Sequence, residues 1–150
     1  MEIKEGYMPF MGYQTYYRIV GKTEEGKSPI ILLHGGPGST HNYFELLDRV
    51  AETGRAVIMY DQLGCGNSFV EGHPELWTPE TWLNELCALI DYLHIDHFHL
   101  LGQSWGGMLT IIYLIEKQAK GVKSAILSST LSSSKLWASE IGRASCRERV

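Results

Sequence analysis

Short apolar runs alternate with helical patterns along most of the chain. Two of these runs, at 29–33 and 56–60, contain no charged residue, which is typical of strands buried on both faces. After Pro79, one apolar face recurs at the spacing of an α-helix. That face consists of Trp82, Leu86, Leu89, Ile90 and Leu93.

The complete pattern predicts a fold of the α/β class. Strands are predicted at 16–20, 29–33, 56–60, 98–101 and 123–128, and helices at about 42–52, from Pro79 onward, and at 105–117. Gly54 suits the left-handed position after the first helix, and Thr78 before Pro79 suits a helix N-cap. Strands that alternate with helices form a mostly parallel sheet with helices on both faces.

Composition places the chain among ordinary globular proteins. With 150 residues, of which 44% are hydrophobic and 20% charged, it can bury the core of one modest domain. A formal net charge of −4 gives no reason to expect nucleic acid or an anionic membrane as a partner. No apolar run approaches the roughly 20 residues of a membrane span, and segment 1–6 lacks the order of a signal peptide. We therefore expect a cytoplasmic protein.

The cysteines and histidines do not form a metal-binding pattern. Cys65, Cys87 and Cys146 are odd in number and too widely spaced for a disulfide framework or a ligand set. His97 and His99 alternate along a predicted strand, but two histidines without a third ligand nearby are a weak signal. We expect ordinary thiols, no metal and no cofactor.

The last ten residues differ from the rest of the chain. Segment 141–150 has no apolar period and contains Arg143, Arg147 and Arg149. It resembles the translation of a common DNA-sequencing adapter read in frame. We therefore expect residues 1–140 to be the N-terminal part of a domain and 141–150 not to be native, with a genuine basic tail as the alternative.

The strongest chemical signal is a serine between two glycines. Gly102, Ser104 and Gly106 match the pattern G-x-S-x-G, which here lies between a predicted strand and a predicted helix. In that setting the sharp turn holds the serine in a strained conformation and exposes its hydroxyl as a nucleophile. Glycines are needed because β-carbons would collide across the turn. The alternative is a glycine-rich helix start in which the serine is only an N-cap.

A glycine-rich loop, 34–38 (H-G-G-P-G), follows the buried strand at 29–33. In such a layout the loop supplies one backbone N–H to a reacting oxyanion, and the residue after the nucleophile supplies the other. We assign these donors to Gly36 and Trp105, and we expect substrate to contact His34, Gly35 and Gly36. Phosphate binding is disfavoured because the loop lacks the Lys-Ser/Thr end of a P-loop.

Three blocks stand in a fixed order: 34–38, 61–68 (D-Q-L-G-C-G-N-S) and 102–107 (G-Q-S-W-G-G). Together they resemble the proline iminopeptidase family, over about residues 6–134. The resemblance implies the α/β-hydrolase fold and a metal-free serine peptidase that removes N-terminal residues, often proline, from short peptides. It also implies a helical cap after the strand ending near Ser128, with acidic side chains that bind the substrate's free amine.

Two parts of a serine hydrolase site are missing from this chain. No aspartate and no histidine follows Ser104, although the triad order in this fold is serine, acid, histidine. Asp61 precedes the serine, so we assign it to the shape of a turn near the site and not to the triad. A serine hydroxyl without imidazole and carboxylate is a poor nucleophile, so we expect the fragment itself to be inactive.

Other functions stay open at this point. An amidase, esterase or lactonase of the same fold, or amino-acid amides as substrates, would suit the same motifs. A non-catalytic binding protein could keep the scaffold, although it has no need of a strained serine. Dehalogenases and epoxide hydrolases are disfavoured because they resemble this layout with aspartate in place of Ser104. The oligomeric state is not predicted.

Overall fold

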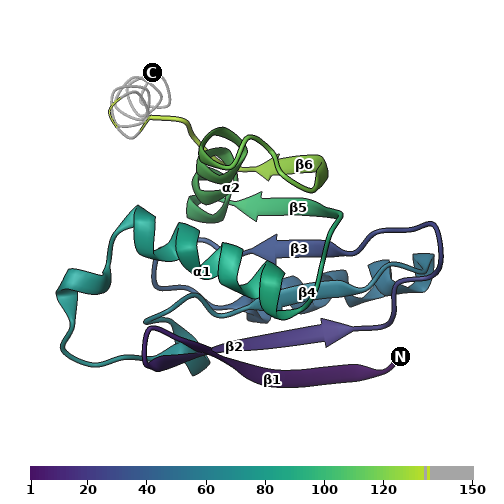
Figure 1. The fold of residues 1–150 in the computed structure, drawn as a ribbon, viewed down its shortest axis with the longest axis horizontal. Helices are drawn as coiled ribbons and strands as arrows, with labels where there is room; N and C mark the ends of the chain where they lie inside the picture. The colour runs from purple at the N-terminus through teal and green to yellow at the C-terminus, as the bar shows by residue number, and fades with distance from the viewer. Residues whose placement is uncertain (134, 136–150) are drawn as a thin grey trace, which may run out of the picture.

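Six strands form one sheet in the computed structural model of the chain, which describes residues 1–133 and 135. The order of the strands is β1-β2-β4-β3-β5-β6 (Figure 1). The strands are β1 (Ile3–Phe10), β2 (Tyr13–Val20), β3 (Ile30–Leu33), β4 (Val57–Tyr60), β5 (Phe98–Gln103) and β6 (Val122–Ser128). The prediction for segment 141–150 lies outside the described residues.

The helices lie between the strands. They are η1 (His41–Thr53), η2 (Gly66–Ser68), η3 (Pro74–Leu76), α1 (Pro79–Tyr92) and α2 (Trp105–Glu116). Thr78 caps α1 as predicted, because its hydroxyl accepts a hydrogen bond from the Thr81 N–H. Gly54 ends η1 with a positive φ of 79°, also as predicted. The helix predicted at about 42–52 is present as η1 and is a 3₁₀ helix, a type that the sequence pattern did not specify.

The sheet is parallel where the site is built and antiparallel at its other end. β4, β3, β5 and β6 run parallel, while β1 pairs with β2 and β2 with β4 in antiparallel register. The predicted fold class is therefore confirmed. The sequence did not predict β1, because Gly6 and Pro9 are unfavourable in strands and only Met8 among its residues is buried. Pro9 is tolerated because β1 is an edge strand.

Two apolar cores lie on opposite faces of the sheet. The larger core joins α1 and α2 to side chains such as Ile31 and Leu33, and both helices lie over this face (Figure 1). The smaller core joins η1 to Leu32 and Met59 on the other face. Neighbouring residues of β3 thus point to opposite cores, as expected of a central strand. Among residues 1–133, no helix combines the length and apolar character that crossing a bilayer requires.

The outer edge of β6 is open and apolar. β6 pairs only with β5 in the described sheet, and the side chains of Ile126 and Leu127 are 50% and 46% exposed. An exposed apolar edge strand presents unpaired backbone groups to a second chain. This edge therefore favours association between copies of the chain.

Ile126→Lys should reduce this association, because a charge on an edge strand opposes edge-to-edge pairing. We expect the concentration at which the 150-residue chain aggregates to rise several-fold, as measured by light scattering during concentration. Ile115→Lys is the matched control, since Ile115 is 68% exposed but lies on α2. Equal gains in the two variants would mean that general hydrophobicity, and not the β6 edge, causes the association.

Candidate active site

Ser104 lies in the tight turn between β5 and α2. Its backbone dihedrals are φ 55° and ψ −118°, a conformation that costs a non-glycine residue about 1–3 kcal/mol. Hydrogen bonds on both sides hold this conformation: the Ser104 N–H donates to the Ser128 carbonyl at 3.0 Å, and the Ser104 carbonyl accepts from Thr130 Oγ1 at 2.6 Å. The strain predicted from G-x-S-x-G is therefore present in the structure.

The glycines around Ser104 are required by close approach of the backbone. A β-carbon on Gly106 would overlap the carbonyl oxygen of Leu33 at the end of β3, and one on Gly102 would overlap the Gly106 carbonyl. A β-carbon on Gly107 would overlap the side chain of Thr130. The first turn of α2 thus packs directly against the sheet, as the steric argument from the sequence predicts.

The glycine loop after β3 lies beside this turn. A β-carbon placed on Gly35 would be 3.2 Å from Cβ of Ser104, so the two segments are in direct contact. The Gly35 N–H donates to the Tyr43 hydroxyl at 2.7 Å, and that hydroxyl donates to Gln103 Oε1 at 2.9 Å. Tyr43 therefore ties the loop to the residue that precedes the nucleophile. Sequence patterns gave no signal for this role of Tyr43.

Two backbone N–H groups near Ser104 are available to a ligand. Among residues 1–133, neither the Gly36 N–H nor the Trp105 N–H has a hydrogen-bond acceptor. The Trp105 N–H is free because it starts α2, where no carbonyl of the preceding turn can reach it. Gly36 has a φ of 119°, which favours glycine. The Ser104 side chain likewise makes no capping hydrogen bond. The assignment of the two N–H groups as oxyanion donors stays a prediction.

His34 supports the loop from inside the protein. Its side chain is fully buried, its Nε2 accepts a hydrogen bond from the Gln62 N–H at 3.0 Å, and its Nδ1 lies 2.8 Å from the Gly35 carbonyl. The ring is therefore neutral with its proton on Nδ1, and burial lowers its pKa. The expected contact between substrate and residue His34 stays a prediction, while the buried ring itself positions the loop.

Gln62 connects the two sides of the site. Its Nε2 donates to the His34 carbonyl at 2.9 Å, and its Oε1 accepts from the indole N–H of Trp105 at 2.9 Å. The side chain is fully buried. One amide thus fixes the first residue of the glycine loop relative to the residue that follows Ser104. Gln62 belongs to the block 61–68, but its residue type alone did not indicate this function.

Asp61 shapes the turn after β4, in agreement with the sequence-based assignment. The carboxylate is buried and accepts hydrogen bonds from the backbone and ring of His41, each at 2.8 Å, and from the Asn67 N–H at 3.0 Å. Burial opposes ionisation, but these hydrogen bonds outweigh it and lower the pKa of Asp61. These hydrogen bonds connect the turn after β4 to the start of η1.

Glu85 of α1 anchors the same turn. Its buried carboxylate accepts hydrogen bonds from the Leu63 N–H at 2.9 and 3.0 Å and from the Thr15 hydroxyl at 2.5 Å. Burial raises the pKa of Glu85 to about 7, although these hydrogen bonds act in the opposite direction. The sequence gave no indication of this residue, because an isolated glutamate on a helix is normally exposed.

The structure offers no evident metal site near these residues. In the part of the chain that it describes, no three histidine, cysteine, aspartate or glutamate side chains gather closely enough to hold a metal ion. The nitrogens of His99 lie 2.7 Å from Ser124 Oγ and 3.2 Å from an Arg55 nitrogen. Its neighbours are therefore a hydroxyl and a guanidinium, not further metal ligands.

Taken together, the sheet order, the strained serine turn between β5 and α2 and the adjacent glycine loop define the α/β-hydrolase fold. Residues 28–145 match the family model described as the alpha/beta hydrolase fold, and the chain belongs to this family.

The particular relatives are proline iminopeptidases. The chain is 69% identical over 140 residues to the enzyme of that name from Clostridioides difficile (strain 630), covering 93% of this chain and 48% of the relative. It is 62% identical over 145 residues to the one from Lactobacillus acidophilus, covering 95% and 49%. The resemblance predicted from the three motif blocks is thus confirmed. The chain spans about half the length of the curated relatives it matches.

Solved structures agree with this placement. A crystal structure titled proline iminopeptidase from Mycobacterium smegmatis matches with a TM-score of 0.86 and 35% identity, covering 93% of this chain and 48% of the other. VinJ matches with a TM-score of 0.87 and 38% identity, covering 94% and 48%. Two epoxide hydrolase structures match at only 23% identity, which shows a common fold and nothing further.

Gly106→Ala should lower the free energy of unfolding more than Gly6→Ala does. The added methyl would meet the Leu33 backbone, which cannot move without shifting β3, so we expect a loss of about 3 kcal/mol in the free energy of unfolding. In Gly6→Ala the methyl would meet only the end of the Tyr17 side chain. Urea denaturation measures both, and equal losses would contradict the close approach of α2 to β3.

Glu85→Gln should change how stability depends on pH. The folded chain holds the Glu85 proton up to about pH 7, whereas an ordinary glutamate loses it near 4.5. The free energy of unfolding of the unmodified chain should therefore fall, relative to Glu85→Gln, by about 3 kcal/mol as pH rises from 4 to 8. Denaturation at several pH values measures this. Exposed Glu80→Gln is the control, and an equal slope there would refute the assignment to Glu85.

Proposed function

We propose that this chain is the nucleophile-bearing half of a serine hydrolase that acts as a proline iminopeptidase. The observation that carries the proposal is the strained Ser104 in contact with the glycine loop at Gly35, next to two unpaired backbone N–H groups. Relatives at 60–69% identity bear the name proline iminopeptidase, which supports the same activity.

In the proposed reaction, Ser104 Oγ attacks the acyl carbon of a substrate. The proton of the hydroxyl passes to a histidine and from there to the leaving amine, and water later releases the acyl group. The N–H groups of Gly36 and Trp105 stabilise the oxyanion, and loss of one such donor typically costs about 10²–10³-fold in rate. The histidine and its acid do not follow Ser104 in this chain, so another segment must supply them.

The proposed substrates are short peptides with an N-terminal residue, often proline, and amino-acid amides as a second class. The proposal requires no cofactor and includes the cytoplasmic location expected from the sequence. An amidase, esterase or lactonase remains the alternative within the fold. These alternatives differ in leaving group, which a substrate panel distinguishes.

A chimaera provides the direct test. It joins residues 1–133 of this chain to the part of the Clostridioides difficile relative that this chain does not match. We expect it to hydrolyse proline amides and proline-initiated dipeptides faster than esters or lactones, and Ser104→Ala to lower kcat by about 10⁴-fold or more. Ser132→Ala is the matched control and should leave kcat unchanged.

A fluorophosphonate probe tests the nucleophile separately from the substrate. It should label the chimaera and the Ser132→Ala variant but not Ser104→Ala. Equal labelling of all three would refute Ser104 as the nucleophile. Labelling without peptide hydrolysis would leave the nucleophile in place but reject the peptidase activity.

A further inference from the structure

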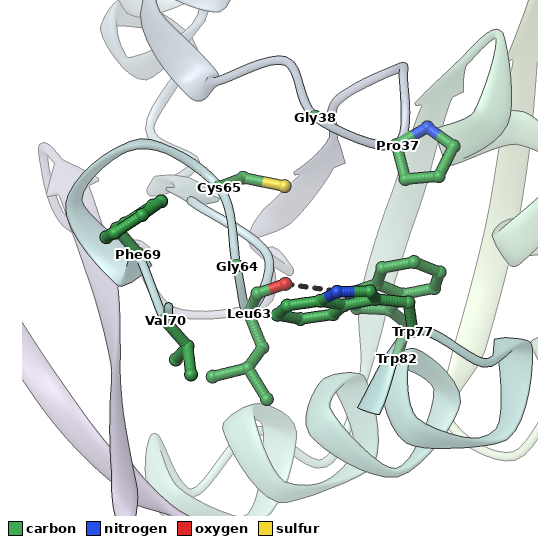
Figure 2. A pocket seen from close by; sticks show the side chains of 9 residues that line it. All are labelled: Pro37, Gly38, Leu63, Gly64, Cys65, Phe69, Val70, Trp77 and Trp82. Carbon is green, nitrogen blue, oxygen red and sulfur yellow. Dashed lines mark hydrogen bonds between the residues drawn. The ribbon is translucent and has the colours of Figure 1, made fainter. Parts of the chain in front are cut away.

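An apolar pocket of about 420 Å³ opens between the glycine loop and the segment that follows β4 (Figure 2). Pro37 and Gly38 form one side, and Leu63, Trp77 and Trp82 contribute to the rest. The volume lies within the range of pockets that bind small molecules, which are mostly lined by apolar and aromatic side chains.

The pocket adjoins both proposed oxyanion donors. Gly38 is two residues from Gly36, and two residues span at most about 7 Å. On the other side, the Trp82 ring packs edge-to-face against Trp105 with ring centroids 5.3 Å apart. A carbonyl oxygen held by the N–H groups of Gly36 and Trp105 therefore places the adjoining side chain of a substrate within reach of the pocket.

The walls of the pocket are held in place before any ligand binds. The Leu63 carbonyl accepts a hydrogen bond from the Trp82 indole at 3.1 Å, the dashed line in Figure 2, while Glu85 holds the Leu63 N–H. The Trp77 and Trp82 rings are stacked with their centroids 6.2 Å apart, and the α-carbon of Gly64 lies against the Trp77 ring. A preformed wall lowers the entropic cost of binding.

The lining selects for an uncharged group. No acidic or basic side chain is among the residues that line the pocket. The thiol of Cys65 is the polarisable exception, and burial raises its pKa to about 11, so it stays neutral near pH 7. Two indole rings present surfaces that suit another ring or a branched aliphatic chain.

We infer that this pocket binds the apolar side chain, aromatic or branched, of a substrate residue that adjoins the scissile carbonyl. The inference rests on the proposed function and specifies its substrates. The same side-chain chemistry can come from the acyl residue or from the leaving residue. The two arms of the experiment distinguish these sources.

The chimaera is assayed with two series of substrates. In one series the acyl residue is proline and the leaving residue is Gly, Leu or Phe; in the other, Gly, Leu or Phe is the acyl residue of a fixed amide. Val70→Phe narrows the pocket at a half-buried lining position. In one of the two series, Val70→Phe should lower the ratio of kcat/KM for the Phe substrate to kcat/KM for the Gly substrate by about 10- to 100-fold. Its kcat/KM for the Gly substrate should stay within about twofold of the value for the unsubstituted chimaera.

Trp77→Leu enlarges the pocket and serves as the opposite change. It should shift the preference within the same series toward larger side chains. Leu46→Phe, at a position of η1 that is 86% exposed, is the control and should alter neither series. If neither pocket variant changes a preference while the chimaera remains active, the pocket is not a substrate subsite, although the proposed function stands.

A binding measurement keeps the inference testable even if the chimaera has no activity. Phenylalaninamide, titrated into the 150-residue chain, should change tryptophan emission because Trp77 and Trp82 line the pocket. Val70→Phe should weaken this binding at least about fivefold, whereas glycinamide should give no change. No response to phenylalaninamide, or a response unaltered by Val70→Phe, would overturn the inference independently of any hydrolysis.

Discussion

The close approach of α2 to the end of β3 is the contact on which the rest of the site depends. Gly106 lies so near the Leu33 carbonyl that any side chain there would overlap it. The glycine loop continues directly from Leu33, so this one contact sets the position of the nucleophile turn relative to the loop. Ser104 can keep a costly conformation because hydrogen bonds from β6 and from α2 determine its dihedrals from both sides.

Buried polar groups extend this rigidity beyond the backbone. Gln62 bonds to His34 on one side and to Trp105 on the other, while Glu85 holds the adjoining peptide at Leu63. Each of these groups is costly to bury alone, but each has its hydrogen bonds satisfied, so the network favours one arrangement over others. Leu63, whose N–H this network holds, also lines the apolar pocket, which links the geometry proposed for catalysis to that proposed for substrate choice.

This half of the fold is organised without the segments that its relatives have in addition. Cores lie on both faces of the sheet, and the loop and the turn are already in contact at Gly35 and Ser104. In the described residues, the open side of the sheet is the edge at β6. The Ser104 turn and the glycine loop thus form one structural unit within this chain.

The sequence by itself determined the central strands, the longer helices and the local sterics around Ser104, although it missed the edge strand β1. Apolar runs and caps such as Gly54 and Thr78 are short-range signals, and the elbow at Ser104 is a steric consequence of its neighbouring glycines. Only the tertiary structure decided which distant residues support them. Tyr43, Gln62 and Glu85 are ordinary in sequence, and their roles arise because the strand order β4-β3-β5 brings their segments together. Likewise, only the tertiary structure shows that the His34 ring is fully buried, because residue types do not reveal on which side of a loop a ring will lie.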